Sequence, residues 1–361
     1  MTDVATPRPD SQRAATTLMP FLQRVAPALL LVVLAPLVAE FLLGDFSARS
    51  IGLIVVFMPL YGCGALLVRE LARRTGRGWP TMLFLALAYA LIEEGYTTQS
   101  LFNPSYAGQR LLDYGYIPFL GTSLHWALFV LAIHVVWSIS TPILIAEGIA
   151  GDRRTTPWLR RPGLAVTAVL YVLGCATTTA FTFQHSHFVA SVPEFLAVAV
   201  LVVGAVIVAL AAFSPGARRG SAASAGRAPA PWVVGVVAFV LASAFQLVVF
   251  DLPSHDVPAA LTVLAIVALE LAAALLLARW SRGAGWTPAH LLALAAAAVL
   301  TYAWVGMNQF LHGRTNLGAC VTPVEVGAQV VEILAVLGLV AWAVLRDRRA
   351  AVREPAAAAT A

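Results

Sequence analysis

The chain consists mainly of apolar runs separated by short polar connections. A membrane-spanning helix needs about 20 consecutive apolar residues. Runs of about that length lie at 24–43, 51–71, 80–100, 122–146, 163–183, 193–213, 232–250, 258–279, 288–311 and 324–345. The pattern predicts an all-α fold, a polytopic transmembrane helix bundle of about ten spans.

The distribution of basic residues predicts the side of the membrane on which each connection lies. All 23 basic residues are arginine, and the net charge is +5. If both termini are cytoplasmic, only Arg49, Arg110 and Arg314 fall on the outer side, which leaves 20 of the 23 on the inner side. Cytoplasmic loops carry such an excess of positive charge. We therefore predict a multi-pass protein of the cell (plasma) membrane with both termini in the cytoplasm.

Composition excludes a soluble globular protein. Hydrophobic residues make up 60% of the chain and charged residues 11%, and the mean hydropathy is +0.83. Soluble domains contain about 25% charged residues. Because membrane topology accounts for the positive charge, we expect the lipid bilayer as a partner and no nucleic acid. The three cysteines, Cys63, Cys175 and Cys320, are too few for a disulfide framework.

A linker divides the predicted spans into two bundles. Residues 214–231 are rich in small residues, proline and arginine, which is typical of a flexible cytoplasmic linker. It separates a six-span bundle, 24–213, from a four-span bundle, 232–345. Residues 1–23 form a predicted cytoplasmic N-terminal tail, and the alanine-rich tail 346–361 is predicted to be disordered.

The strongest chemical signal is an acidic pair inside an apolar run. Glu93 and Glu94 lie in the third predicted span, where a carboxylate costs roughly 2.5–3.5 kcal/mol at the bilayer centre. The next span places His134 roughly 18 Å below its outer end, near the midplane, and the carboxylates lie in height between His125 and His134. His125 points to the opposite face of that helix, so we predict that His134 faces the carboxylates. The aromatic connection 101–121 is predicted to cover them.

The enzyme interpretation of these residues rests on a resemblance. The Glu93-Glu94 pair followed by His134 resembles intramembrane metalloproteases and their relatives, a group that includes the Abi/CAAX-processing (CPBP) and PrsW-like families. The resemblance covers roughly residues 80–190 and includes a formal FxxxH match at 181–185. Thr98 stands where the CPBP pattern has arginine, and the chain has no lysine for the PrsW-like pattern. Two other stretches, 61–71 and 100–104, resemble an uncharacterised bacterial family of multi-pass membrane proteins.

The resemblance implies a metal-dependent peptidase. In this interpretation Glu94 and His134 bind a divalent metal, commonly zinc, and Glu93 is the general base. Asn308 and His312, which share a helix face at i and i+4, are candidates to polarise the substrate carbonyl.

Two other functions fit the same residues. In a proton-coupled transporter of a small solute, Glu93, Glu94, His134 and the isolated Glu270 are protonation sites on the substrate path, with Asn308 and His312 beside it. In a non-catalytic membrane scaffold, the polar residues only hold helices together.

The predicted topology is tested by reporter fusions. A reporter in the 101–121 connection and one in the 214–231 linker are expected to report opposite sides of the membrane, because an odd number of predicted spans separates them. Activity measurements of a periplasmic and a cytoplasmic reporter at each position check this. Two reporters on one side would contradict the assignment of the spans.

Overall fold

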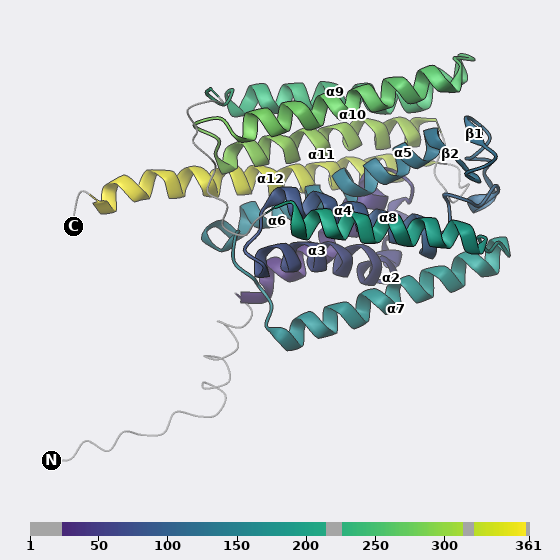
Figure 1. The fold of residues 1–361 in the computed structure, drawn as a ribbon. Coiled ribbons are helices and arrows are strands. Elements are labelled where there is room, and N and C mark those ends of the chain that lie inside the picture. The colour runs from purple at the N-terminus through teal and green to yellow at the C-terminus, as the bar shows by residue number, and fades with distance from the viewer. Residues whose placement is uncertain (1–23, 214–225, 313–320, 359–361) are drawn as a thin grey trace, which may run out of the picture.

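The computed structural model describes residues 24–213, 226–312 and 321–358, with only the backbone described for 350–358. Within these ranges the chain is a bundle of helices with one short antiparallel hairpin (Figure 1). The hairpin pairs β1 (Tyr116–Ile117) with β2 (Thr122–Ser123). It marks one end of the bundle, called the hairpin end below, and the chain leaves α12 at the opposite end.

The N-terminal part is made of helices that change their winding along their length. The first span, Arg24–Leu42, finishes in the π-helix η1 (Leu37–Leu42). The elements that follow are η2 (Ala48–Leu53), α2 (Ile54–Phe57), η3 (Met58–Gly62), α3 (Cys63–Arg74), α4 (Trp79–Ile92), η4 (Glu93–Thr97), η5 (Tyr106–Gly108), α5 (Leu124–Ile133), η6 (His134–Ser140), α6 (Thr141–Ala150) and η7 (Gly151–Arg153).

The remaining helices are long and continuous. They are α7 (Arg161–Ser186), α8 (Val192–Ala211), α9 (Pro231–Ser254), α10 (Ala259–Ser281), α11 (Pro288–Leu311) and α12 (Pro323–Ala358). Pro at the first or second position begins α7, α8, α9 and α11, where its missing N–H is not needed by the helix.

The predicted membrane-spanning helical bundle is confirmed. Nine helices of the described ranges are long and apolar enough to cross a membrane. The predicted third span, 80–100, is not one of the nine. Its helix, α4 with η4, covers 79–97, and the two glutamates lower the hydropathy of its outer part. This helix is instead surrounded by protein, with contacts to α3, α8 and η6. The side of the membrane on which each terminus lies remains a prediction.

The helix formed by α5, η6 and α6 is the centre of the bundle. In its most apolar stretch 72% of the residues are buried, against 11% in α7 and in α10. Its Trp137 stacks on Tyr302 of α11 at 4.7 Å and donates a hydrogen bond to the Ala298 carbonyl. On its other face, Ile139 and Ile143 join the core formed with the first span, α3 and α4. One helix therefore connects both halves of the chain.

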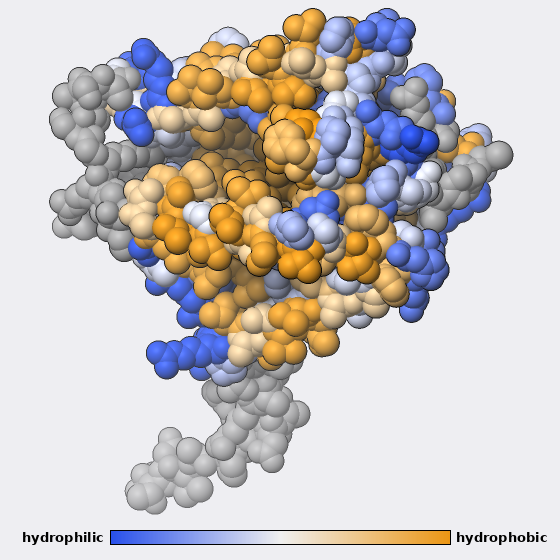
Figure 2. Space-filling model, turned by 45° about the vertical axis from the view of Figure 1, so that its right-hand side comes forward, coloured by the Kyte–Doolittle hydropathy of each residue, from blue (hydrophilic) through white to orange (hydrophobic). Residues whose placement is uncertain are grey.

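The outer helices present apolar side chains to the surroundings. Exposed leucines and valines follow the lengths of α7, α8 and α10. In Figure 2 apolar side chains cover the middle of the face shown, and hydrophilic residues gather mainly toward its margins. This distribution fits a protein in contact with the lipid bilayer.

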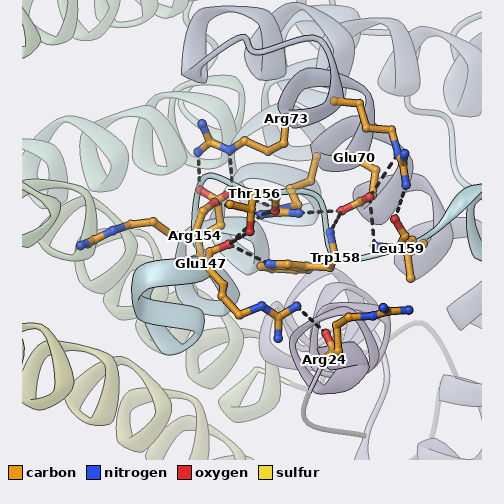
Figure 3. A network of polar contacts seen from close by, with 11 residues as sticks. Arg24, Glu70, Arg73, Glu147, Arg154, Thr156, Trp158 and Leu159 are labelled. Atoms are coloured by element: carbon orange, nitrogen blue, oxygen red, sulfur yellow. Dashed lines mark hydrogen bonds and ion pairs between the residues drawn. The ribbon is translucent and has the colours of Figure 1, made fainter. Parts of the chain in front are cut away.

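A buried ion-pair network closes the end opposite the hairpin (Figure 3). The fully buried Arg69 of α3 contacts Glu70 at 2.6 Å and Glu147 of α6 at 3.0 Å. Arg73 binds the second oxygen of Glu147 at 2.6 Å. The Arg69 guanidinium also lies 3.5 Å from the ring centre of Trp158, which follows α6 in the chain.

Both chain segments predicted to be flexible lie partly outside the described residues. Of the linker 214–231, residues 226–231 are described, and Arg227 pairs with Ala284 in an isolated bridge. The tail 346–361 differs from the expectation of disorder, because α12 continues through it to Ala358. Arg346 donates to the Ile149 carbonyl and Asp347 pairs with Arg154, so the start of this tail is held against the bundle.

The ion-pair network gives a stability prediction. Glu147→Ala removes the partner of the buried Arg69 and the half-buried Arg73. It is expected to lower the free energy of unfolding by about 3–5 kcal/mol. Chemical denaturation of the detergent-purified protein measures this change. The matched control is Asp113→Ala, which removes the partner of the exposed Arg110 and should change stability little, because water replaces the lost contact. Equal effects of the two substitutions would contradict a stabilising role of the buried network.

Candidate functional site

Two adjacent glutamates and a histidine from different helices meet inside the bundle. Glu93 and Glu94 begin η4, directly after α4, and His134 begins η6. His134 Nε2 lies 2.6 Å from Glu94 Oε1, and His134 Nδ1 lies 3.4 Å from Glu93 Oε2. Glu93 is 1% exposed, Glu94 4% and His134 5%, so each side chain is almost completely buried. The imidazole therefore faces both carboxylates.

Local π-helical winding places the residues of this site. Glu93 and Glu94 lie in η4, His134 in η6, Glu40 in η1 and Tyr61 in η3, and all four segments are π-helical. A π-turn adds a residue to an α-helix, is rare, and often occurs at functional sites. Its wider winding changes the direction of the side chains on the turn. Four such turns in four neighbouring helices distinguish this region from the continuous helices α7 to α12.

Glu94 is held by hydroxyl groups. Its Oε2 accepts hydrogen bonds from Thr98 Oγ1 at 3.0 Å and from Ser100 Oγ. Ser100 Oγ in turn accepts a hydrogen bond from Trp126 Nε1 at 3.1 Å. These contacts occupy Oε2 and leave Oε1 directed to His134. Thr98, the residue that departs from the CPBP pattern, therefore contributes a donor to the Glu94 carboxylate.

His134 is enclosed by aromatic rings and a serine. Its Nδ1 lies 3.1 Å from Ser138 Oγ, one helical turn further on. The Tyr61 ring stacks on the imidazole with centroids 6.0 Å apart, and the Tyr89 ring lies edge-on at 6.4 Å. The sequence prediction that His134 and not His125 faces the carboxylates agrees with this geometry, since His125 contacts the Val249 carbonyl.

Glu93 has an oxygen without a hydrogen bond. Its Oε2 is buried and has no hydrogen-bond partner among the described residues. The hydroxyl groups of Tyr61 and Tyr89 lie beside this carboxylate and interact with it. The Tyr89 hydroxyl is itself buried without a hydrogen bond of good geometry in the described part of the chain. A buried polar atom without a partner costs about 1–3 kcal/mol. These two groups are therefore available to a ligand.

Glu40 and Tyr61 belong to the site and were not assigned to it from the sequence. Glu40 interacts electrostatically with Glu93, Glu94 and His134, and Tyr61 interacts with both Glu40 and Glu93. In the sequence Glu40 is a polar residue near the end of the first span, and Tyr61 begins the stretch 61–71, which resembles an uncharacterised bacterial family. Their depth in two different spans gave no reason to place them together.

A glycine permits this approach of the first two spans. A Cβ atom on Gly62 would lie 2.2 Å from the Val32 carbonyl oxygen, far inside the contact distance. Only glycine therefore fits directly after Tyr61, where η3 packs against the first span.

The aromatic connection 101–121 supplies a tyrosine to the site. The half-buried Tyr106 interacts with the carboxylates of Glu94, Glu40 and Glu93. Burial and these neighbouring charges raise the pKa of the Tyr106 phenol well above its ordinary value near 10. The predicted cover over the acidic pair thus has a contact in the structure.

The other predicted site residues lie apart from this cluster. Glu270 is half-buried on α10, and no described residue forms an ion pair or hydrogen bond with it. Asn308 and His312 are exposed, and His312 Nδ1 contacts the Asn308 carbonyl at 2.8 Å. His185 of the FxxxH match is exposed and contacts the Phe181 carbonyl of its own helix. The structure does not bring these four residues to Glu93, Glu94 and His134.

The chain belongs to an uncharacterised membrane protein family, whose family model matches residues 29–357. The match covers the whole helical bundle, including every residue of the cluster. Comparisons with curated proteins and with solved structures gave no match.

The contact between Glu94 and His134 is testable by a double-mutant cycle. Glu94→Gln and His134→Gln are each expected to destabilise the protein by about 1–3 kcal/mol, because each leaves a buried partner unsatisfied. The double variant should lose less than the sum, with a coupling of about 0.5–3 kcal/mol. Denaturant unfolding in detergent measures all three. In the control cycle Glu94→Gln with His125→Gln, the effects should add, and equal coupling in both cycles would refute a specific contact.

Proposed function

We propose that this protein is a metal-dependent hydrolase with its active site inside the membrane, and that it acts on a peptide bond. The observation that supports this is the convergence of Glu93, Glu94 and His134. One ligand atom from each residue lies within 4.8 Å of the others, and all three residues are buried. Ligands of a single ion can be about 4–5 Å apart when each is about 2–2.5 Å from it.

The donor set fits a catalytic divalent metal. Catalytic zinc sites use three protein ligands, such as histidine and glutamate, and leave a position for water. Glu94 and His134 are the proposed ligands, and the Glu93 carboxylate lies within the same 4.8 Å, where it would face a water bound at the open position. Glu93 Oε2 lies 3.4 Å from His134 Nδ1 but has no hydrogen bond among the described residues, so it could still bind a cation or a water.

The surrounding side chains orient the two proposed ligands. Thr98 and Ser100 donate to one oxygen of Glu94, so its other oxygen is directed to the proposed metal position. Ser138 contacts Nδ1 of His134, so Nε2 is directed to Glu94. Such contacts fix a ligand and tune its basicity. A divalent metal held here would supply Lewis acidity and a lowered pKa for bound water.

Glu93 and Tyr89 have the remaining roles in hydrolysis. The Glu93 carboxylate would accept a proton from the attacking water and return it to the amine that leaves when the C–N bond breaks. The Tyr89 hydroxyl, which lies beside Glu93, would donate a hydrogen bond to the oxygen that becomes negative during the attack. Exclusion of bulk water by the bundle strengthens both interactions.

A second candidate function is proton-coupled transport of a small solute. The observation that favours it is the position of the imidazole between two carboxylates, with one ring nitrogen facing each. Such a chain can transfer a proton from Glu94 to Glu93 through His134. Glu270, which was also assigned to this path, lies outside the cluster and so gives the transport hypothesis no further support.

Metal content separates the two functions. The purified protein is expected to bind about one zinc ion per chain, and Glu94→Gln and His134→Ala are each expected to abolish the binding, because each removes a ligand. Elemental analysis of protein dialysed against zinc measures the ratio.

The control is Glu270→Gln, which removes a membrane carboxylate away from the cluster and should leave the zinc content unchanged. A wild-type protein that stays metal-free after zinc addition would exclude the hydrolase. Transport is then tested by the pH dependence of solute movement in Glu94→Gln.

A further inference from the structure

Three carboxylates interact with His134 at the centre of the site, and a fourth lies beside one of them. Glu40 interacts with Glu93, Glu94 and His134, and Asp45 interacts with Glu40. Within the described residues no arginine forms an ion pair with any of these four acids. Even with His134 protonated, full ionisation would leave three negative charges uncompensated.

Other buried acids in the same bundle are compensated. Glu70 and Glu147 pair with Arg69, Arg73 and Arg74 at the opposite end. At the hairpin end Glu325, which is 3% exposed, pairs with Arg49. The half-buried Glu270 and Glu332 also lack an arginine, but each stands alone. Among the described residues, Glu40, Asp45, Glu93 and Glu94 are therefore the group of neighbouring acids that has no arginine partner. An uncompensated charge inside a membrane is strongly unfavourable, so this cluster must hold protons or metal cations.

Two of the four acids keep accessible surface. Glu93 and Glu94 are buried, whereas Glu40 and Asp45 are only partly buried. Asp45 lies at the hairpin end, in the connection after the first span, and Gln309 of α11 donates to it. Tyr106 interacts with all four carboxylates and so lies where they converge. The acids therefore form a continuous series from the hairpin end to His134.

We propose that Glu40 and Asp45 line a cation-selective path that leads from the hairpin end of the bundle to the Glu93, Glu94 and His134 site. The proposal that this path carries a divalent metal rests on the proposed function. The existence of the path does not depend on hydrolysis. The path ends at the site, because the Arg69 network fills the opposite end of α3 and α6.

The electrostatics of Asp45 agree with such a path. Burial and the neighbouring Glu40 carboxylate raise the pKa of Asp45 to about 8. An acid with this pKa holds a proton at neutral pH and releases it when a cation approaches. A series of acidic groups also attracts cations and raises their rate of entry.

Thiol labelling tests the path without any assumption about activity. Asp45→Cys and Glu40→Cys are made separately in full-length protein that carries Cys63→Ala, Cys175→Ala and Cys320→Ala, and the protein is reconstituted in liposomes. Each variant is treated with a membrane-impermeant trimethylammonium or sulfonate methanethiosulfonate. The reference is Ser105→Cys, an exposed position in the 101–121 connection at the same end.

Both introduced thiols are expected to react from the same side of the membrane as the Ser105→Cys thiol. Relative to that reference, the cationic reagent should react about tenfold faster than the anionic one. In the Asp45→Cys protein, the added substitution Glu40→Gln should reduce this preference. The matched control Asp113→Asn, which removes an exposed acid paired with Arg110, should leave it unchanged.

Three results would overturn the path: no reaction at position 45, reaction from the opposite side, or equal preference for both reagents. If Glu40→Cys does not fold, the Asp45→Cys measurements decide alone. Failure of the proposed metal function gives a different result. The thiols are then labelled as expected, but the protein binds no zinc.

Discussion

The cost of placing charge in a low-dielectric interior is the constraint on which this structure depends. At one end of the bundle it is met by pairing, since the fully buried Arg69 is bound by Glu70 and Glu147 and lies on the Trp158 ring. Within the Glu93, Glu94 and His134 cluster it is met only in part, by one imidazole and a set of hydroxyl groups. Stability alone favours the first arrangement, because every charge has a partner. The second arrangement leaves more carboxyl groups than basic groups, which is the property expected of a site that binds cations or transfers protons.

Deviations from regular α-helix bring this site together. Glu40, Tyr61, Glu94 and His134 each lie on a π-helical segment of a different helix. The same spans return to α-helix beyond the cluster, as α3 and α6 show, and are joined at their far ends by the Arg69 network. The rigid end holds the helices in register, and the irregular segments position the side chains. Functional sites commonly concentrate such local irregularity.

The resemblance to intramembrane metalloproteases is limited to a few residues, and the structure agrees with it at some of them and departs from it at others. Glu93, Glu94 and His134 meet as the resemblance implies, whereas His185 of the FxxxH match faces away on α7. Thr98, in place of arginine, adds a hydroxyl donor and no positive charge. The cluster is therefore more acidic than one with an arginine at that position. The membership in an uncharacterised family leaves the chemistry of the cluster as the basis for a functional proposal.

The sequence by itself determined the membrane class, the helical bundle, the acidic pair and its histidine partner. These follow from apolar run length, from the cost of a membrane carboxylate and from the rise per residue, which sets the depth of His134. Only the tertiary structure decided which further residues join the cluster, because depth and helical periodicity do not specify this. The π-turns add residues to the helical repeat, so Glu40 and Tyr61 turn toward the cluster in a way that regular spacing does not predict. Arg69 is another example. In the sequence it is one of the arginines that indicate the cytoplasmic side of the membrane. In the structure it is buried in the core beside Glu147, because only the folded bundle brings α3 and α6 together.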